Sequence, residues 1–143
     1  MKLSKAQVFD ISKVVKIHNE IMDYKYSYDS FYNELNFDYS LFYVLKDDED
    51  VIGYFIIHCL FETIDLVIIG VNETYQNKGY GHFLMDYIIY LTLKNKGTNI
   101  MLEVNINNKK AISFYENYDF KLIDRRINYY GNNNDALVYR KEL

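Results

Sequence analysis

The chain has 143 residues, half of them apolar and a quarter charged, which predicts a single globular domain over residues 1–143. Its formal net charge of −4 argues against broad nucleic-acid binding, because contact with phosphates requires an excess of Lys and Arg. A single cysteine, Cys59, excludes an internal disulfide. No apolar run reaches the length of a bilayer span and no signal peptide precedes the domain, so we expect a cytoplasmic protein. As a separate expectation, the protein is a monomer or a weak dimer.

The first third of the chain predicts a strand and two helices. Residues 3–9 are expected to form a short strand, and Asp10 follows as a candidate N-cap. Apolar side chains then recur every three or four residues up to Ile21, which is the spacing of an amphipathic helix. His18 falls on the apolar face of this helix, so we expect a packed or half-exposed side chain rather than a ligand. A second short helix is predicted over residues 27–35.

Three strands are predicted next, because three segments are rich in branched and aromatic residues: 39–46, 51–61 and 63–71. An acidic turn at residues 47–50 joins the first two as a hairpin. We therefore expect three consecutive antiparallel strands in this part of the chain.

The remainder of the chain predicts two helices and three strands. Leu84, Ile88 and Leu91 form the apolar stripe of a helix that begins near His82, and Gly97 is its expected C-terminal cap. The later elements are a strand, a helix capped by Asn107 or Asn108, and two final strands, at residues 98–104, 107–118, 120–130 and 136–141. Because a helix separates the fourth and fifth strands, these two are expected to be parallel.

A turn with two glycines lies between the fourth predicted strand and the following helix. Its sequence is Gln76-Asn77-Lys78-Gly79-Tyr80-Gly81. Such a turn directs unpaired backbone N–H groups and the positive end of a helix dipole at one point, which predicts an anion cradle with a lysine beside it. The turn lacks the Gly-Lys-Ser/Thr of a Walker loop and the third glycine of the dinucleotide fingerprint. From these residues alone, a glycine turn that only caps the helix is the alternative.

The Gln-x-x-Gly-x-Gly pattern resembles the pyrophosphate loop of the GCN5-related N-acetyltransferases (GNAT), which holds acetyl-coenzyme A. Two further stretches resemble the RimI-type ribosomal-protein-alanine N-acetyltransferases of that superfamily: Leu102-Glu103-Val104 with Asn108, Ala111-Ile112, Phe114-Tyr115-Glu116 and Phe120, and Arg125-Arg126-Ile127-Asn128-Tyr129-Tyr130 with Asp135-Ala136. The resemblance spans nearly the whole chain. It implies an α+β fold of the α/β/α type, with a mixed central sheet of about seven strands flanked by about four helices.

The chain departs from the family pattern in three places. Asp119 replaces the usual Gly before Phe120, and Asp tolerates the left-handed conformation at some cost. The usual Trp between the first two helices is absent, and Tyr24, Tyr26 and Tyr28 lie nearby instead, which affects the substrate entrance more than the cofactor site. Gly70 replaces an Ala of the fourth strand, and its small size should leave the backbone accessible.

The resemblance also implies binding residues. The implied contacts with acetyl-coenzyme A come from the fourth strand, the glycine turn and a helix cap: Ile69, Gly70, Val71, Gln76, Asn77, Lys78, Gly79, Tyr80, Gly81 and Asn108. Among them, the Val71 N–H would serve as an oxyanion-type donor. The implied contacts with the acceptor are Tyr24, Tyr26, Tyr129, Tyr130 and Asp135. No metal is expected, because the three histidines show no ligand spacing with Cys or carboxylates.

Glu103 and Tyr115 are the candidate catalytic pair. Glu103 interrupts an apolar strand, and partial burial raises a carboxylate's pKa toward the range that suits a general base. The alternative is a strand glutamate that simply faces solvent. The resemblance implies that Glu103 acts through a water and that Tyr115 protonates the departing sulfur of coenzyme A, while core packing is the alternative role for Tyr115.

The chemistry of amines favours an N-terminal α-amine as acceptor. Its neutral form costs about 1.4 kcal/mol at pH 7, against about 4–5 kcal/mol for a lysine side chain. The RimI resemblance implies the N-terminal alanine of a small-subunit ribosomal protein. The alternatives are a small amine such as a polyamine or an antibiotic, an aminoacyl-tRNA, or a non-catalytic sensor of acyl-coenzyme A.

Overall fold

The computed structural model describes residues 1–143 and contains one mixed sheet of seven strands in the order β1-β2-β3-β4-β5-β7-β6. The strands are β1 (Lys2–Lys5), β2 (Ser40–Asp47), β3 (Asp50–Cys59), β4 (Thr63–Val71), β5 (Asn99–Asn105), β6 (Lys121–Arg126) and β7 (Ala136–Glu142). The helices are α1 (Ile11–Ile21), α2 (Tyr28–Glu34), α3 (Tyr80–Lys94) and α4 (Lys109–Asn117), with 3-10 turns at Val8–Asp10 and Glu73–Tyr75. The predicted α+β class is confirmed.

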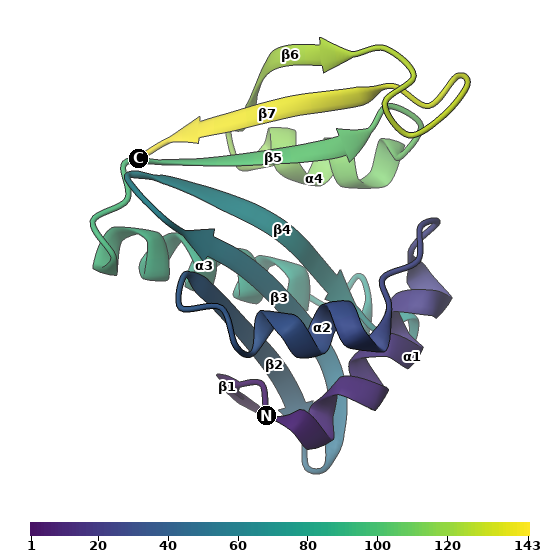
Figure 1. Ribbon diagram of the computed structural model, residues 1–143, viewed down its shortest axis with the longest axis vertical. Coiled ribbons are helices and arrows are strands. Elements are labelled where there is room, and N and C mark those ends of the chain that lie inside the picture. Colours follow the sequence, from purple (N-terminus) through teal and green to yellow (C-terminus); the bar gives the residue numbers. More distant parts are fainter.

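Helices cover both faces of the sheet (Figure 1), with α1 and α2 on one face and α3 and α4 on the other. Strand alternation supplies a core to each face, because successive side chains point to opposite sides. On β2, Val44 packs with α1 and α2, whereas Leu45 packs with α3. On β3, Ile56 and Ile57 divide in the same way. The near-continuous apolar runs of these strands therefore reflect burial on both faces.

The predicted parallel pairing of β4 and β5 is present but short. It joins only Thr63–Asp65 to Asn99–Met101, and beyond this point the two strands diverge (Figure 1). The outer neighbours do not diverge with them, since β3 pairs with β4 as far as Val71 and β7 pairs with β5 as far as Asn105. Each diverging strand therefore keeps one edge without a ladder partner, and the two open edges face the same gap.

The predicted first strand is too long. β1 ends at Lys5, and the chain then forms a 3-10 turn that leaves Phe9 exposed. Asp10 precedes α1 as predicted, but its carboxylate does not cap that helix. The carboxylate instead accepts the Gln7 N–H at 2.8 Å and pairs with Lys46 Nζ at 2.6 Å, so it ties the turn to β2.

Two further boundaries differ from the prediction. At the end of α3 the residue with positive φ is Lys96, at 62°, and not Gly97. Gly97 is required for space, because a Cβ there would lie 2.7 Å from the Thr92 side chain. Near the C-terminus β6 stops at Arg126, four residues early, because Asn128 takes a positive φ of 53° and donates its N–H to the Asp135 carboxylate at 2.8 Å.

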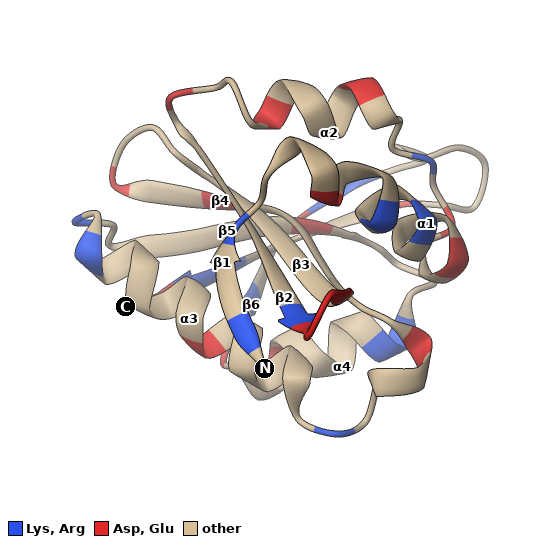
Figure 2. Ribbon diagram, turned by 90° about the horizontal axis from the view of Figure 1, so that it is seen from below, with Lys and Arg blue, Asp and Glu red and all other residues tan.

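Acidic and basic residues are interspersed along the fold (Figure 2), with acidic residues at the turn between β2 and β3. This turn is the predicted acidic hairpin of residues 47–50. No helix is both long enough and apolar enough to cross a membrane.

Candidate active site

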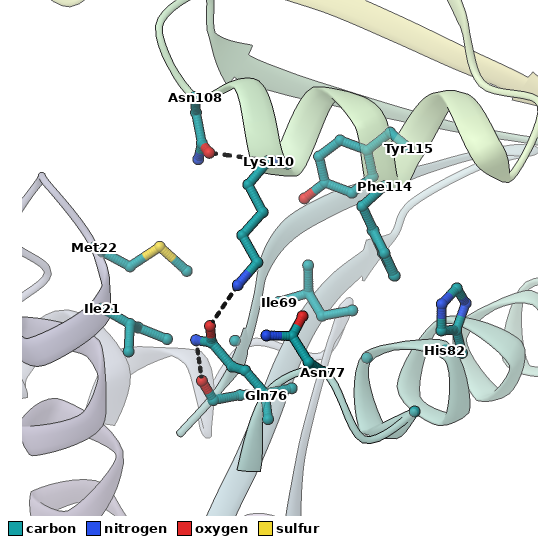
Figure 3. Close-up of a pocket in the computed structure, with 15 residues that line it drawn as sticks. Ile21, Met22, Ile69, Gln76, Asn77, His82, Asn108, Lys110, Phe114 and Tyr115 are labelled. Carbon is teal, nitrogen blue, oxygen red and sulfur yellow. Dashed lines mark hydrogen bonds between the residues drawn. The ribbon is translucent and has the colours of Figure 1, made fainter. Parts of the chain in front are cut away.

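A cavity of about 300 Å³ lies between the end of β4, the start of α3 and α4 (Figure 3). Nine of the residues predicted for the site line it: Ile69, Gly70, Val71, Gln76, Asn77, Gly79, Gly81, Asn108 and Tyr115. Residues as far apart in the sequence as Ile69 and Tyr115 thus line the same cavity. The topology achieves this because the crossover through α3 returns the chain beside β4, and α4 then follows β5.

The glycine turn presents a row of free backbone donors to this cavity. Asn77 and Gly79 take positive φ values of 61° and 91°, and this curls the chain immediately before α3 begins at Tyr80. None of the N–H groups of residues 77–82 donates a hydrogen bond within the protein. Unpaired N–H groups at the positive end of a helix dipole favour an anion. The turn therefore has the donors and the helix-dipole orientation that favour an anion, and phosphate binding at this position stays a prediction.

The open edge of β4 adds two more donors. The Asn72 N–H bonds to the Ile52 carbonyl on β3 at 2.7 Å. Because successive N–H groups of a strand point to opposite edges, those of Val71 and Ile69 point to the edge that faces β5. That edge has no ladder partner beyond Asp65. An extended ligand with amide groups can therefore pair with β4 as an additional strand would.

The sequence predicts that the small size of Gly70 leaves the backbone accessible, but the space beside its Cα is filled. The space that a Cβ would occupy is filled by the Tyr54 ring, with ring atoms 2.8 Å from that position. The Tyr54 hydroxyl is hydrogen-bonded to His18 Nδ1 at 2.9 Å, and His18 Nε2 is hydrogen-bonded to the Tyr24 carbonyl oxygen at 3.0 Å. Gly70 thus makes room for a buried Tyr54–His18 pair, and His18 is a packed residue as predicted.

Tyr115 extends from α4 into the cavity, with its hydroxyl on the cavity side (Figure 3). Burial raises its pKa well above the ordinary value, and the nearby phenols of Tyr24 and Tyr130 act in the same direction. Burial and the Glu103 charge raise the pKa of Tyr130 to about 12. These mutual effects place Tyr24, Tyr115, Tyr130 and Glu103 in one neighbourhood, although they come from four separate segments.

Glu103 lies on β5, beyond the last residue that pairs with β4, and does not line the cavity itself. Its side chain is 34% exposed and pairs with Arg126 across a 3.0 Å contact. The Arg126 guanidinium also lies over the Tyr129 ring, 5.3 Å from its centre. The carboxylate is thus neither buried nor free in solvent, and it is held in place beside the divergence of β4 and β5.

The predicted acceptor contacts differ in how they are held. Asp135 is buried and accepts hydrogen bonds from the Asn128 N–H and from Arg125 Nε, at 2.8 and 2.6 Å, and both hold its pKa below the usual range. Its carboxylate therefore fastens the turn between β6 and β7. The Tyr26 hydroxyl donates to Glu34 at 3.1 Å. Tyr24, Tyr129 and Tyr130 are each about half exposed.

Sequence reasoning missed six residues that line the cavity: Ile21, Met22, His82, Lys110, Ala111 and Phe114. Of the residues predicted to contact the cofactor, Lys78 and Tyr80 do not line it. Lys78 Nζ lies 5.8 Å from the centre of the Tyr75 ring, and the lysine that reaches the cavity is Lys110. The position of Lys110, two residues after the Asn108 cap, could have indicated that it reaches the cavity. Nothing in the local sequence indicates that Ile21 and Met22, at the end of α1, line the cavity.

The comparisons with known proteins agree with this geometry. The sequence profile of the acetyltransferase (GNAT) family matches residues 11–120. A protein named N-alpha-acetyltransferase from Saccharolobus solfataricus is 30% identical, over 99% of this chain and 92% of its own length.

Two solved structures share the fold at low identity. The ribosomal-protein-S18-alanine N-acetyltransferase from Escherichia coli has a TM-score of 0.89 and 23% identity, over 99% of this chain and 92% of that chain. An aminoglycoside 6'-N-acetyltransferase complexed with coenzyme A has a TM-score of 0.84 and 13% identity, over 99% of this chain and 97% of that chain. A protein acceptor and a small-amine acceptor thus occur on one fold, so the fold does not choose between them. The match over residues 11–120 and the identity over the whole chain show that this chain is an N-acetyltransferase of the GNAT family.

Proposed function

We propose that this enzyme transfers the acetyl group of acetyl-coenzyme A to the α-amine of a protein N-terminus. The observation that carries the proposal is the junction of three features at one cavity: the free N–H groups of residues 77–82, the open edge of β4 and the Tyr115 hydroxyl. The turn would hold the diphosphate, and the β4 edge would pair with the pantetheine amides. Acetyl-coenzyme A supplies the thioester, whose acetyl carbon is the electrophile.

The residues beside the cavity have chemistry that suits direct transfer. The amine nitrogen forms a bond with the acetyl carbon and the carbon–sulfur bond breaks, so one proton must leave the amine and one must reach the sulfur. Glu103 accepts the amine proton through a water, and Tyr115 donates the proton to the sulfur. The Val71 N–H faces the open edge and stabilises negative charge that develops on the carbonyl oxygen.

An α-amine suits this site better than a lysine side chain. About 1.4 kcal/mol neutralises an α-amine at pH 7, so a partly exposed glutamate is a sufficient base. The relative from Saccharolobus solfataricus, similar over the whole chain, carries the name of an enzyme with this acceptor class. The RimI-like motifs around Glu103, Tyr115 and Tyr130 favour the N-terminal alanine of ribosomal protein S18 as the first acceptor to test.

Mass spectrometry of synthetic peptides tests this function. One peptide begins with a free alanine and copies the N-terminus of the host's ribosomal protein S18, and a matched peptide has a blocked α-amine and an internal lysine. After incubation with acetyl-coenzyme A, we expect one acetyl group on the α-amine of the first peptide and none on the second. The Glu103→Gln variant should lose this activity while still binding coenzyme A.

Other outcomes point to the alternatives. Acetylation of spermidine or an aminoglycoside, with both peptides unmodified, would contradict the proposal and assign a small-amine acceptor. Acetylation of an aminoacyl-tRNA would assign the third acceptor class. Binding of acetyl-coenzyme A without turnover of any amine would leave a sensor.

A further inference from the structure

Two hydrogen bonds in series cross the candidate cofactor cavity. Lys110 Nζ donates to Gln76 Oε1 at 2.7 Å, and Gln76 Nε2 donates to the Val71 carbonyl oxygen at 2.9 Å (Figure 3). Lys110 belongs to the first turn of α4, Gln76 opens the glycine turn and Val71 ends β4. The series therefore connects the three elements that form the cavity walls.

The Lys110 ammonium is the one lysine or arginine group among the side chains that line the cavity, and no carboxylate lines it. Lys110 forms no ion pair, and its one hydrogen-bond partner is the neutral amide of Gln76. An ammonium has three donors, and a charge-assisted bond to an anion is roughly twice as strong as a bond between neutral groups. An anionic ligand would therefore displace the amide.

Gln76 at the same time occupies an acceptor that a ligand needs. The Val71 carbonyl and N–H both point to the open edge of β4, and the Gln76 side chain holds the carbonyl. An amide N–H of an extended ligand would compete for this oxygen. A ligand with both an anionic group and amides would thus replace both bonds at once, so neither the ammonium nor the carbonyl would be left unpaired.

We propose that Lys110 binds the diphosphate of the acyl-coenzyme A donor and that Gln76 is the partner it leaves when the donor enters. This inference rests on the proposed function, because it assumes that coenzyme A occupies the cavity. In the absence of donor, the Lys110–Gln76–Val71 series closes the gap between α4 and β4. In its presence, the ammonium and the N–H groups of residues 77–82 meet the diphosphate from two sides.

Isothermal titration calorimetry with three probes tests the proposal. The probes are coenzyme A, dephospho-coenzyme A, which keeps only the diphosphate, and pantetheine, which carries no phosphate. Lys110→Met should weaken the binding of the first two roughly tenfold and leave pantetheine unchanged or slightly tighter. Lys110→Arg should restore most of the affinity. Lys109→Met, which removes a neighbouring lysine that does not line the cavity, is the matched control and should change binding little.

Any of the following results would overturn the inference. Equal weakening by Lys110→Met and Lys109→Met would mean that only the general charge of α4 matters. Equal weakening for coenzyme A and pantetheine would mean a structural role for Lys110. A loss confined to coenzyme A, absent with dephospho-coenzyme A, would assign the ammonium to the 3'-phosphate. If the wild-type protein binds none of the probes, the proposed function fails as well, whereas wild-type binding with an unaffected Lys110→Met variant refutes the inference alone.

Discussion

At the scale of single residues, glycine is required at different positions for different physical reasons. Gly79 takes a φ of 91° and has open space around it, so its conformation requires glycine. Gly70 and Gly97 are required because their Cβ atoms would collide with packed side chains. Asp119, predicted to tolerate the left-handed region, has a φ of 65° and confirms that expectation.

We expect Gly70→Ala to destabilise the protein by about 1–3 kcal/mol, because overpacking of a filled core forces side chains from their preferred positions. The added Cβ would lie 2.8 Å from Tyr54, whose hydroxyl is fixed by His18. Urea unfolding followed by circular dichroism measures the change. Gly81→Ala is the matched control, since Gly81 lies in α3 and its added Cβ would meet Phe114 at an ordinary 3.4 Å. Equal stability of Gly70→Ala and wild type would contradict the described Tyr54 position.

At the scale of elements, the divergence of β4 and β5 organises the site. A parallel pair that continued to Val71 would satisfy the strand edges and leave no place for a ligand. The strands part after three residue pairs, and α4 and the turn between β6 and β7 bring Tyr115 and Tyr130 beside the gap. The proposed base and the proposed acid thus come from β5 and α4, and neither element forms a site alone.

We predict that Glu103→Gln lowers the turnover number more than Tyr115→Phe does. A general base contributes about 10²–10⁴-fold, whereas a thiol with a pKa of about 8.5 leaves tolerably as a thiolate without an acid. Because burial raises the pKa of Tyr115, the wild-type rate should show no fall near pH 10 from loss of its proton. Steady-state kinetics against pH test both statements. Tyr118→Phe, at the end of α4 and outside the cavity, is the control, and a larger loss with Tyr115→Phe would reject this ranking.

At the scale of the whole molecule, a buried histidine links α1, β3 and the connection before α2. His18 on α1 is fully buried, contacts Tyr54 on β3 and holds the Tyr24 carbonyl in the connection before α2. Burial lowers its pKa, and the bond to the Tyr24 carbonyl offsets this in part. The folded state therefore favours the neutral imidazole, so protonation of His18 lowers the stability of the domain.

We expect the free energy of unfolding to decrease as the pH falls below about 6.5, the ordinary histidine pKa. At pH values between 6.5 and the lowered pKa of folded His18, the unfolded chain binds a proton that the folded chain does not. The free energy of unfolding therefore falls by at most about 1.4 kcal/mol for each pH unit of decrease. Urea unfolding at several pH values between 5 and 8 measures the slope. His18→Gln should flatten it, whereas His82→Gln, at an exposed position, should retain it. An unchanged slope in His18→Gln would assign the dependence to other groups.

The sequence by itself determined the order of elements and the position of the glycine turn, because both follow from local periodicity and from glycine spacing. The predicted strand ends were wrong where side-chain hydrogen bonds and an ion pair determine the end of the strand. β6 stops early because the Asp135 carboxylate bonds to the Asn128 N–H, and β1 stops early because Asp10 bonds to Gln7 and Lys46.

Only the tertiary structure decided which lysine reaches the cavity. The packing also determines that position 70 requires a glycine. Lys78 is adjacent to the cradle in sequence but lies over Tyr75, while Lys110 arrives from another helix. The Tyr54–His18 pair beneath Gly70 joins residues 36 positions apart, and no local pattern encodes such a contact. The site is formed by strands that diverge, and divergence is a property of how the sheet twists and packs between its helices rather than of any one segment.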